Sequence, residues 1–196
     1  TPFVRVALGL ALGGAMLGAG EWTERHPLGD GRTRDVIPPA LSGAGIFAIF
    51  VSLYAAHGMF GLLGPALAFT GLGLTAYAAL VLALRQGAFV AVVGLAGGYL
   101  VPELVTAPDP AILPVFLYLF VLGAGCLVLM MYRAWWWFAA LTLIGALGWP
   151  YLYLTGAFRP GDEGVLGAYI VGIAGAFALF STRLPVKTPR MPVLRW

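Results

Sequence analysis

Residues 110–132 have the sequence PAILPVFLYLFVLGAGCLVLMMY, a continuous apolar run in which no side chain carries a charge. The hydrocarbon core of a bilayer is roughly 30 Å thick, and a helix of about 20 apolar residues crosses it. A helix is favoured over a strand because the run shows no alternation of apolar and polar residues, and because a helix pairs its own backbone groups in lipid. This stretch therefore predicts a transmembrane helix.

Runs of similar character fill nearly all of the 196-residue chain, which is 61% hydrophobic and 10% charged. Soluble domains carry roughly 25% charged residues, so the composition indicates a membrane protein. The expected helices cover residues 3–21, 38–57, 65–84, 88–101, 110–132, 135–154 and 164–183. We predict an all-α integral membrane bundle of about seven transmembrane helices, in which residues 1–183 form one domain. Residues 184–196 are expected to form a basic, proline-containing cytoplasmic tail.

The ends of two expected helices are marked by proline and glycine. Pro38-Pro39 is expected to open the second helix, because a proline is tolerated at a helix start. The fourth helix is short, since fourteen residues span only about 21 Å. It contains glycines at 94, 97 and 98 and is followed by Pro102. Either this helix continues past Pro102, or it is broken at its glycines, as helices that line substrate sites often are.

The distribution of basic residues predicts the orientation of the chain. With the N-terminus outside, the inner loops and tail carry nine basic residues, and the outer segments carry two, Arg5 and Arg159. The acidic residues divide evenly between the two sides. Membrane proteins concentrate lysine and arginine on the cytoplasmic side. The chain is therefore predicted to have its N-terminus outside and its C-terminus inside.

Small residues recur at spacing four in several expected helices, which places them on one helix face. Two such sets are Ala7, Ala11, Ala15 and Ala19 in the first helix and Gly164, Ala168, Gly172 and Ala176 in the last. In lipid, faces of this kind let helix backbones approach closely. Packing within the chain is the favoured interpretation, and dimerisation or assembly into a larger complex is the alternative.

Several stretches resemble, in order and spacing, a bacterial family of large polytopic proteins. They include Arg5-Val6-Ala7-Leu8-Gly9, Gly43-Ala44-Gly45-Ile46, Leu82-Ala83-Leu84-Arg85-Gln86 and Gly97-Gly98-Tyr99-Leu100-Val101-Pro102. The family is known as domain of unknown function 2339, and the likeness covers roughly residues 3–154. The resemblance implies a many-helix inner-membrane fold with no assigned activity and no catalytic residues. Family members are usually much longer, so a short member or a fragment is expected, and Glu103 stands where the family suggests an apolar or small residue.

Two groups of polar residues are candidates for a site. Glu21, Arg85 and Arg133 are expected at the inner ends of their helices, where a carboxylate at membrane depth is usually paired. A structural ion pair is expected there, with a proton or substrate site as the alternative. A candidate pathway or polar cluster at the outer ends consists of His57, Gly97, Gly98, Tyr99, Pro102, Glu103 and Asp109. These residues either line an outer vestibule or are ordinary interfacial residues, since tyrosines collect at membrane surfaces.

Several activities are argued against by the residues present. A retinal protein needs a lysine inside a helix, but the only lysine is Lys187 in the tail, and His26 and His57 lie on opposite sides of the predicted membrane. No zinc-protease motif, phosphate loop or Ser-His-Asp set can be assembled. Cys126 is the only cysteine and has no partner for a disulfide. We therefore expect no cofactor, no bound metal and no nucleic-acid partner.

Two functions remain open at this point. A transport or lipid-handling module, using the short fourth helix and the polar outer ends, is narrowly preferred. A structural or assembly subunit that packs through small-residue faces is the alternative, and an intramembrane enzyme comes third. The expected partners are membrane lipids and, for an assembly role, other membrane helices or a second copy of the chain. The expected location is the bacterial inner membrane.

Overall fold

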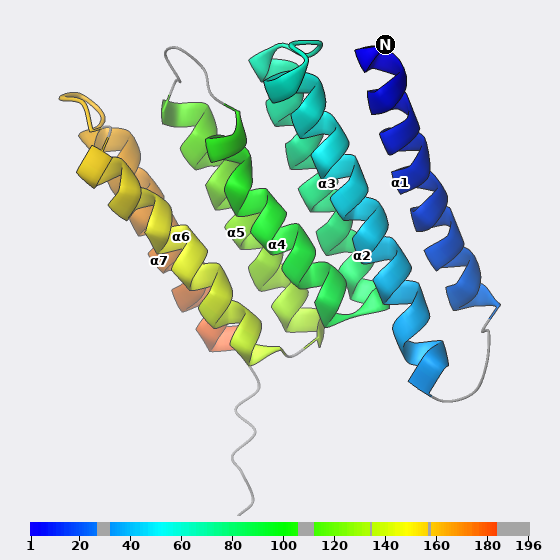
Figure 1. Cartoon of the computed structure of the whole chain (residues 1–196). Helices are drawn as coiled ribbons and strands as arrows, with labels where there is room; N and C mark the ends of the chain where they lie inside the picture. Colours follow the sequence, from blue (N-terminus) through cyan, green and yellow to red (C-terminus); the bar gives the residue numbers. More distant parts are fainter. Residues whose placement is uncertain (27–31, 106–111, 134, 157, 184–196) are drawn as a thin grey trace, which may run out of the picture.

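The computed structural model describes residues 1–26, 32–105, 112–133, 135–156 and 158–183, and this part of the chain is helical without strands (Figure 1). The helices are α1 (Pro2–Arg25), α2 (Arg32–Tyr54), α3 (Pro65–Gln86), α4 (Ala88–Leu104), α5 (Ile112–Arg133), α6 (Trp136–Gly156) and α7 (Glu163–Arg183), and a π-helical turn, η1 (Ala55–Met59), continues α2. All but α4 are long and apolar enough to cross a membrane. The prediction of an all-α, multi-pass membrane bundle is therefore confirmed. The predicted tail, residues 184–196, lies outside the described residues.

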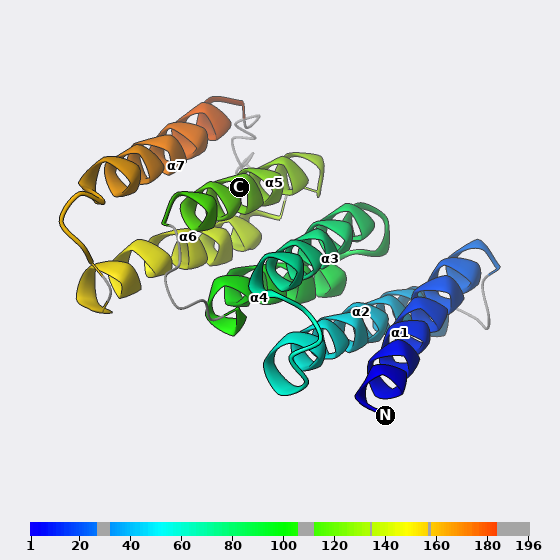
Figure 2. The ribbon, with the colours of Figure 1, turned by 90° about the horizontal axis from the view of Figure 1, so that it is seen from above.

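Successive helices run in opposite directions and follow one another across the molecule (Figures 1 and 2). α1 packs chiefly on α2 and α3 chiefly on α4, while α5 contacts α3, α6 and α7. Seen from above, α1 lies at one edge of the array and α7 at the opposite edge (Figure 2). The result is an open array with two edges rather than a closed ring of helices. Its core includes Leu72, Leu122 and Phe138, all fully or nearly fully buried.

The fourth helix is continuous. α4 has 17 residues and passes through Pro102 to end at Leu104, so it is short but not broken at its glycines. Its length of about 25 Å is still less than the roughly 30 Å of a hydrocarbon core. α4 contacts α2, α3 and α5, and it buries residues such as Val90, Leu95 and Val101. Neighbouring helices therefore shield much of this short helix from lipid.

The prediction that Pro38-Pro39 opens the second helix is wrong. α2 begins at Arg32, and the two prolines lie inside it, in its second turn. A proline ring holds φ near −65°, which is also the helical value, but each proline lacks the N–H that would bond to the preceding turn, and its ring crowds the carbonyl four residues earlier. α1 likewise extends beyond the predicted end at Glu21 to Arg25. An ion pair between Glu21 and Arg25, four residues apart, stabilises this last turn.

The sequence did not predict η1. Within this turn the carbonyl of Ala56 accepts from the backbone N–H groups of Leu62 and Leu63, at 2.7 and 3.3 Å. Nδ1 of His57 lies 2.8 Å from the Leu63 carbonyl. Because a carbonyl oxygen only accepts, Nδ1 of His57 donates this hydrogen bond. Gly61 then turns the chain with a φ of 61°, a conformation that costs glycine little because it has no Cβ.

Small residues allow α1 and α2 to lie in direct backbone contact. A Cβ atom added to Gly13 would stand 2.8 Å from the carbonyl oxygen of Gly45, and one added to Gly45 would stand 2.7 Å from that of Gly13. A Cβ on Gly20 would meet the hydroxyl of Ser42. Any larger side chain at these glycines would force the helices apart. The predicted set Ala7, Ala11, Ala15 and Ala19 is exposed instead, so this face of α1 does not pack within the described part of the chain.

Candidate functional site

The predicted outer cluster is centred on the C-terminal half of α4, where Pro102 interrupts the helical hydrogen bonds. A proline has no N–H, so the carbonyl of Gly98, four residues earlier, loses its helical donor. The hydroxyl of Tyr118, on α5, donates to this carbonyl at 2.9 Å. A polar group left without a partner inside a membrane protein is costly, so Tyr118 offsets the cost of the proline.

In α6, too, a tyrosine hydroxyl compensates for the donor that a proline lacks. Pro150 leaves the carbonyl of Ala146 without a helical donor, and the hydroxyl of Tyr169, on α7, donates to it at 2.9 Å. Tyr169 is buried, as is Pro150. Each of these two proline-containing helices is therefore tied to a neighbour by a tyrosine hydroxyl. The sequence shows the prolines and the tyrosines but not which tyrosine meets which carbonyl.

Tyr99 makes two hydrogen bonds between α4 and α6, one as a donor and one as an acceptor. Its hydroxyl donates to the carbonyl of Thr142 at 3.0 Å, and its own carbonyl accepts from the indole N–H of Trp149 at 2.9 Å. The ring of Tyr99 lies against Gly145, where an added Cβ would clash with the ring. Thr142, Gly145 and Trp149 were not among the predicted site residues. Their spacing of three to four in α6 is the signal that would have placed them on one face.

The glycine face of α4 is occupied by neighbouring side chains. A Cβ added to Gly94 would stand 2.6 Å from the Cβ of Ala79, and one added to Gly97 would stand 2.6 Å from the ring of Phe50. Gly98 similarly faces the side chain of Leu122. These glycines thus allow one face of α4 to pack closely against α2, α3 and α5.

A groove of about 530 Å³ lies between α4 and α6 and is lined by Tyr99, Leu100, Glu103, Gly145, Gly148, Trp149, Leu152 and Tyr153. Glu103 is exposed here, whereas Gly98 is buried. Tyr153 donates a hydrogen bond to the carboxylate of Asp162. Two members of the predicted outer cluster, Tyr99 and Glu103, are thus brought to one groove. His57 belongs to η1 and bonds to Leu63, and Asp109 lies outside the described residues.

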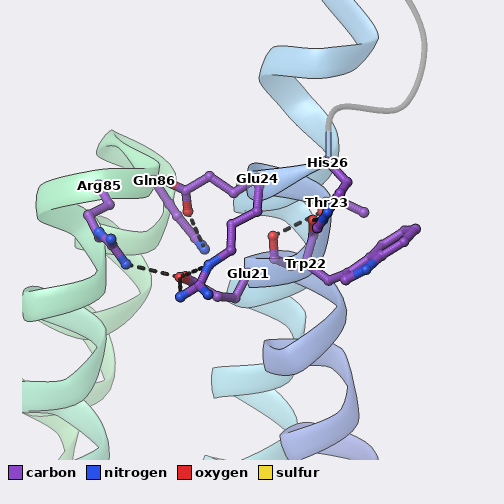
Figure 3. A network of polar contacts seen from close by, with 9 residues as sticks. Glu21, Trp22, Thr23, Glu24, His26, Arg85 and Gln86 are labelled. Atoms are coloured by element: carbon purple, nitrogen blue, oxygen red, sulfur yellow. Dashed lines mark hydrogen bonds and ion pairs between the residues drawn. The ribbon is translucent and has the colours of Figure 1, made fainter.

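The predicted inner cluster forms a polar network between α1 and α3 (Figure 3). One carboxylate oxygen of Glu21, Oε1, accepts from Nη2 of Arg25 at 2.8 Å and from Nη1 of Arg85 at 3.0 Å. Arg133, the third member, lies at the end of α5, and its guanidinium carbon stands 5.2 Å from the centre of the Trp135 ring. The structure therefore brings Glu21 to Arg85 and directs Arg133 to an aromatic ring instead.

Two further residues belong to this network, although they were not predicted. Nε2 of Gln86 donates to Oε2 of Glu24 at 3.2 Å, which gives α1 and α3 a second connection (Figure 3). Gln86 is buried, and its Oε1 has no hydrogen-bond partner among the described residues. Both residues could have been placed in this network from the sequence, because Glu24 lies one turn after Glu21 and Gln86 follows Arg85.

Among the residues that the structure describes, no group of three or more histidine, cysteine, aspartate or glutamate side chains is arranged to hold a metal ion. Next to the inner network, a second groove of about 600 Å³ runs between α1 and α3 and is apolar apart from Glu21 and Arg85.

Comparison with known proteins gives one match. A family model described as "Predicted membrane protein (DUF2339)" matches residues 1–194. No curated protein and no solved structure matches the chain.

Proposed function

The chain belongs to the DUF2339 family of predicted membrane proteins, and on that premise we propose that it is an assembly element of a membrane. In this role, α7 packs against the α7 of a second copy. The observation that carries the proposal is the outward face of α7, which presents the small residues Gly167, Ala174, Gly175 and Ala178. Lipid-facing helix surfaces need no small residues, whereas helix pairs in membranes use them to bring backbones together.

The two faces of α7 differ in side-chain size. Leu166, Tyr169, Ile173 and Phe180 are buried against the array. The exposed face away from the array includes Gly167, Val171, Ala174, Gly175 and Ala178. Ile170 and Leu179 are also exposed, whereas Gly164 and Ala168 line a groove against α5. No described atom lies within 4 Å of a Cβ added to Gly167 or Gly175. Small residues at these exposed positions favour a helix partner.

The packing of α4 also favours an assembly role over transport or lipid handling. The glycines of α4 meet Ala79, Phe50 and Leu122, as expected for close helix packing. Gly97 also lines a groove of about 370 Å³ between α2 and α4, but nearly all of its lining residues are apolar. The array is also open, with α1 and α7 at opposite edges (Figure 2). An edge helix with an unoccupied small-residue face is suited to lateral association, and a two-fold axis along the membrane normal would place identical α7 faces together.

Cysteine cross-linking in reconstituted vesicles tests this proposal. In a Cys126→Ala background, Gly167→Cys is expected to give a covalent dimer under mild oxidation, because a disulfide needs Cα atoms roughly 4.4–6.8 Å apart. Gly14→Cys is the matched control, since Gly14 is an exposed glycine on the opposite edge helix, α1. Adding Gly175→Leu to the Gly167→Cys variant should abolish the dimer. Cross-linking at Gly14→Cys alone, or at neither position, would contradict the α7 pairing.

Transport or lipid handling is the second candidate, and one observation favours it. The groove between α4 and α6 holds the exposed carboxylate of Glu103 beside Tyr99 and Trp149. A charged group in a groove of this size suits a cation or a polar headgroup. Glu103→Gln should then reduce binding or flux in a reconstituted assay without loss of folding. Glu163→Gln, an exposed carboxylate at the same end of the array, should have no effect.

We further propose that the N-terminus faces outward and the C-terminus faces the cytoplasm of a bacterial inner membrane. α1, α3 and α5 carry Arg25, Arg85 and Arg133 in their last turns, and α7 ends at Arg183. These four helices end on the same side of the array, here called the arginine end (Figure 1). The positive-inside rule assigns that side to the cytoplasm. Reporter fusions after residues 26 and 156 should report inside and outside, respectively, and the reverse pattern would overturn this orientation.

A further inference from the structure

The lining of the groove between α1 and α3 is apolar along its length and charged at one end, as a site for an amphiphile would be. It is lined by Leu17, Gly18, Glu21, Ala78, Val81, Leu82 and Arg85, and its volume is about 600 Å³. This volume lies within the roughly 300–1,000 Å³ typical of small-molecule sites. Gly18 leaves room in the groove, because no described atom lies within 4 Å of a Cβ added there.

Two guanidinium groups are exposed at the charged end. The side chains of Arg85 and Arg25 are 61% and 67% exposed, whereas that of Glu21 is 28% exposed. Both guanidiniums bind the same carboxylate oxygen, Oε1 of Glu21, and each has further N–H groups. The neighbouring carboxylate of Glu24 accepts from Gln86. The cations are therefore the outward members of this network, and arginine is well suited to a phosphate because its N–H groups match phosphate oxygens.

The depth of the charged end fits a lipid headgroup. Glu21 and Arg85 lie in the last turns of α1 and α3, at the arginine end (Figure 3). Trp22 is 54% exposed and stacks on His26, with ring centres 5.3 Å apart. Exposed tryptophans of membrane proteins concentrate at the level of the headgroups. The apolar part of the groove then extends from this level toward the membrane interior, where acyl chains lie.

We propose that this groove binds one glycerophospholipid, with its phosphate on Arg85 and Arg25 and one acyl chain between α1 and α3 beside Gly18. The phosphate contributes charge-assisted hydrogen bonds, and the chain covers the apolar surface of Leu17, Val81 and Leu82. The site goes beyond the proposed assembly role, since it uses the α1 edge of the array and not α7. Failure of α7 cross-linking would leave this proposal intact.

Native mass spectrometry of the full chain, released from detergent with added ligands, tests the proposal. Dioleoyl phosphatidylglycerol should bind with a one-to-one component that dioleoylglycerol, which lacks the phosphate, does not show. Inorganic phosphate, which lacks the chains, should neither bind with comparable affinity nor displace the lipid. Arg85→Gln should weaken the one-to-one component about tenfold, the effect of losing one charged hydrogen-bonding group, and Arg85→Lys should restore part of it.

A second variant tests the groove independently of the ion pair. Gly18→Leu places a side chain in the groove, where an added Cβ has no described atom within 4 Å, and should weaken lipid binding to a similar extent. Gly167→Leu is its control, because Gly167 is equally open but lies on α7, at the opposite edge of the array (Figure 2). Arg5→Gln, at the other end of α1, controls for loss of positive charge. Equal binding by wild type and Gly18→Leu, equal binding of dioleoylglycerol, or displacement by phosphate alone would each overturn the proposal.

Discussion

α4 and α7 are both rich in glycine, yet most of their glycines have opposite surroundings, with Gly172 of α7, which packs on Phe120, as the exception. In α4, at the centre of the array, Gly94 and Gly97 are in direct contact with Ala79 and Phe50. In α7, at the edge, no described atom lies within 4 Å of a Cβ added to Gly167 or Gly175. The same residue type therefore allows close packing in one helix and leaves a surface unoccupied in the other. What differs is the position of the helix in the array and not its composition.

The most damaging change should be Gly94→Leu in α4. The added side chain would begin 2.6 Å from the Cβ of Ala79 and 3.3 Å from the carbonyl oxygen of Ala76, and neither atom can move without shifting α3. Overpacking of a tightly packed interior costs about 1–3 kcal/mol and occasionally more, and rigid neighbours place this site at the upper end. Unfolding of the purified protein in mixed micelles measures the loss. Wild-type stability would show that α4 and α3 are not in backbone contact.

Removal of the hydroxyl that binds α4 to α5 should have the next largest effect. Tyr118→Phe leaves the carbonyl of Gly98 without a donor, and an unpaired buried polar group costs about 1–3 kcal/mol. Hydrogen bonds between membrane helices average nearer 0.6 kcal/mol, so about 1 kcal/mol is expected. The same unfolding measurement gives the value.

A double substitution separates this hydrogen bond from the packing of the ring. Pro102→Ala restores an N–H that can bond to Gly98 within the helix. Tyr118→Phe should therefore cost less in the Pro102→Ala background than in the wild type. An equal cost in both backgrounds would show that Tyr118 does not compensate for the missing donor of Pro102.

The sequence predicted the features that each helix determines by itself, but not those that depend on which helices lie beside it. Apolar length predicted the helices, because membrane thickness imposes one requirement on every span. Spacing predicted the small-residue faces, but whether a face meets protein depends on helix order across the array, which no single helix encodes. The pairing of Tyr118 with Gly98 also arises only when α5 lies beside α4. Arg133 was expected near Glu21 from its depth alone, and the lateral position of α5 places it beside Trp135 instead.

A smaller effect is expected at the other edge of the array. Arg85→Gln breaks an ion pair whose arginine is largely exposed, and such pairs contribute little because solvent and salt screen them. The loss of unfolding free energy should be less than that of Tyr118→Phe. The difference between wild type and Arg85→Gln should also become smaller when salt is added. A loss as large as that of Gly94→Leu would mean that α1 depends on this ion pair and not on its packing against α2.

Gly167→Leu in α7 should have the smallest effect on stability, and it is expected to be neutral or slightly stabilising. Glycine is roughly 0.8–1 kcal/mol less favourable than alanine inside a helix, and leucine is nearly as favourable as alanine. Since a Cβ added to Gly167 has no described atom within 4 Å, the free energy of unfolding should stay unchanged or rise by up to about 1 kcal/mol. The measurement must be made at a protein concentration low enough to keep the chain monomeric, because the proposed α7 pairing would otherwise contribute. With Gly94→Leu measured alongside, one substitution is compared at a central and an edge position. A similar loss at both positions would show that α7 is as enclosed as α4, and the exposed face on which the assembly role depends would not exist.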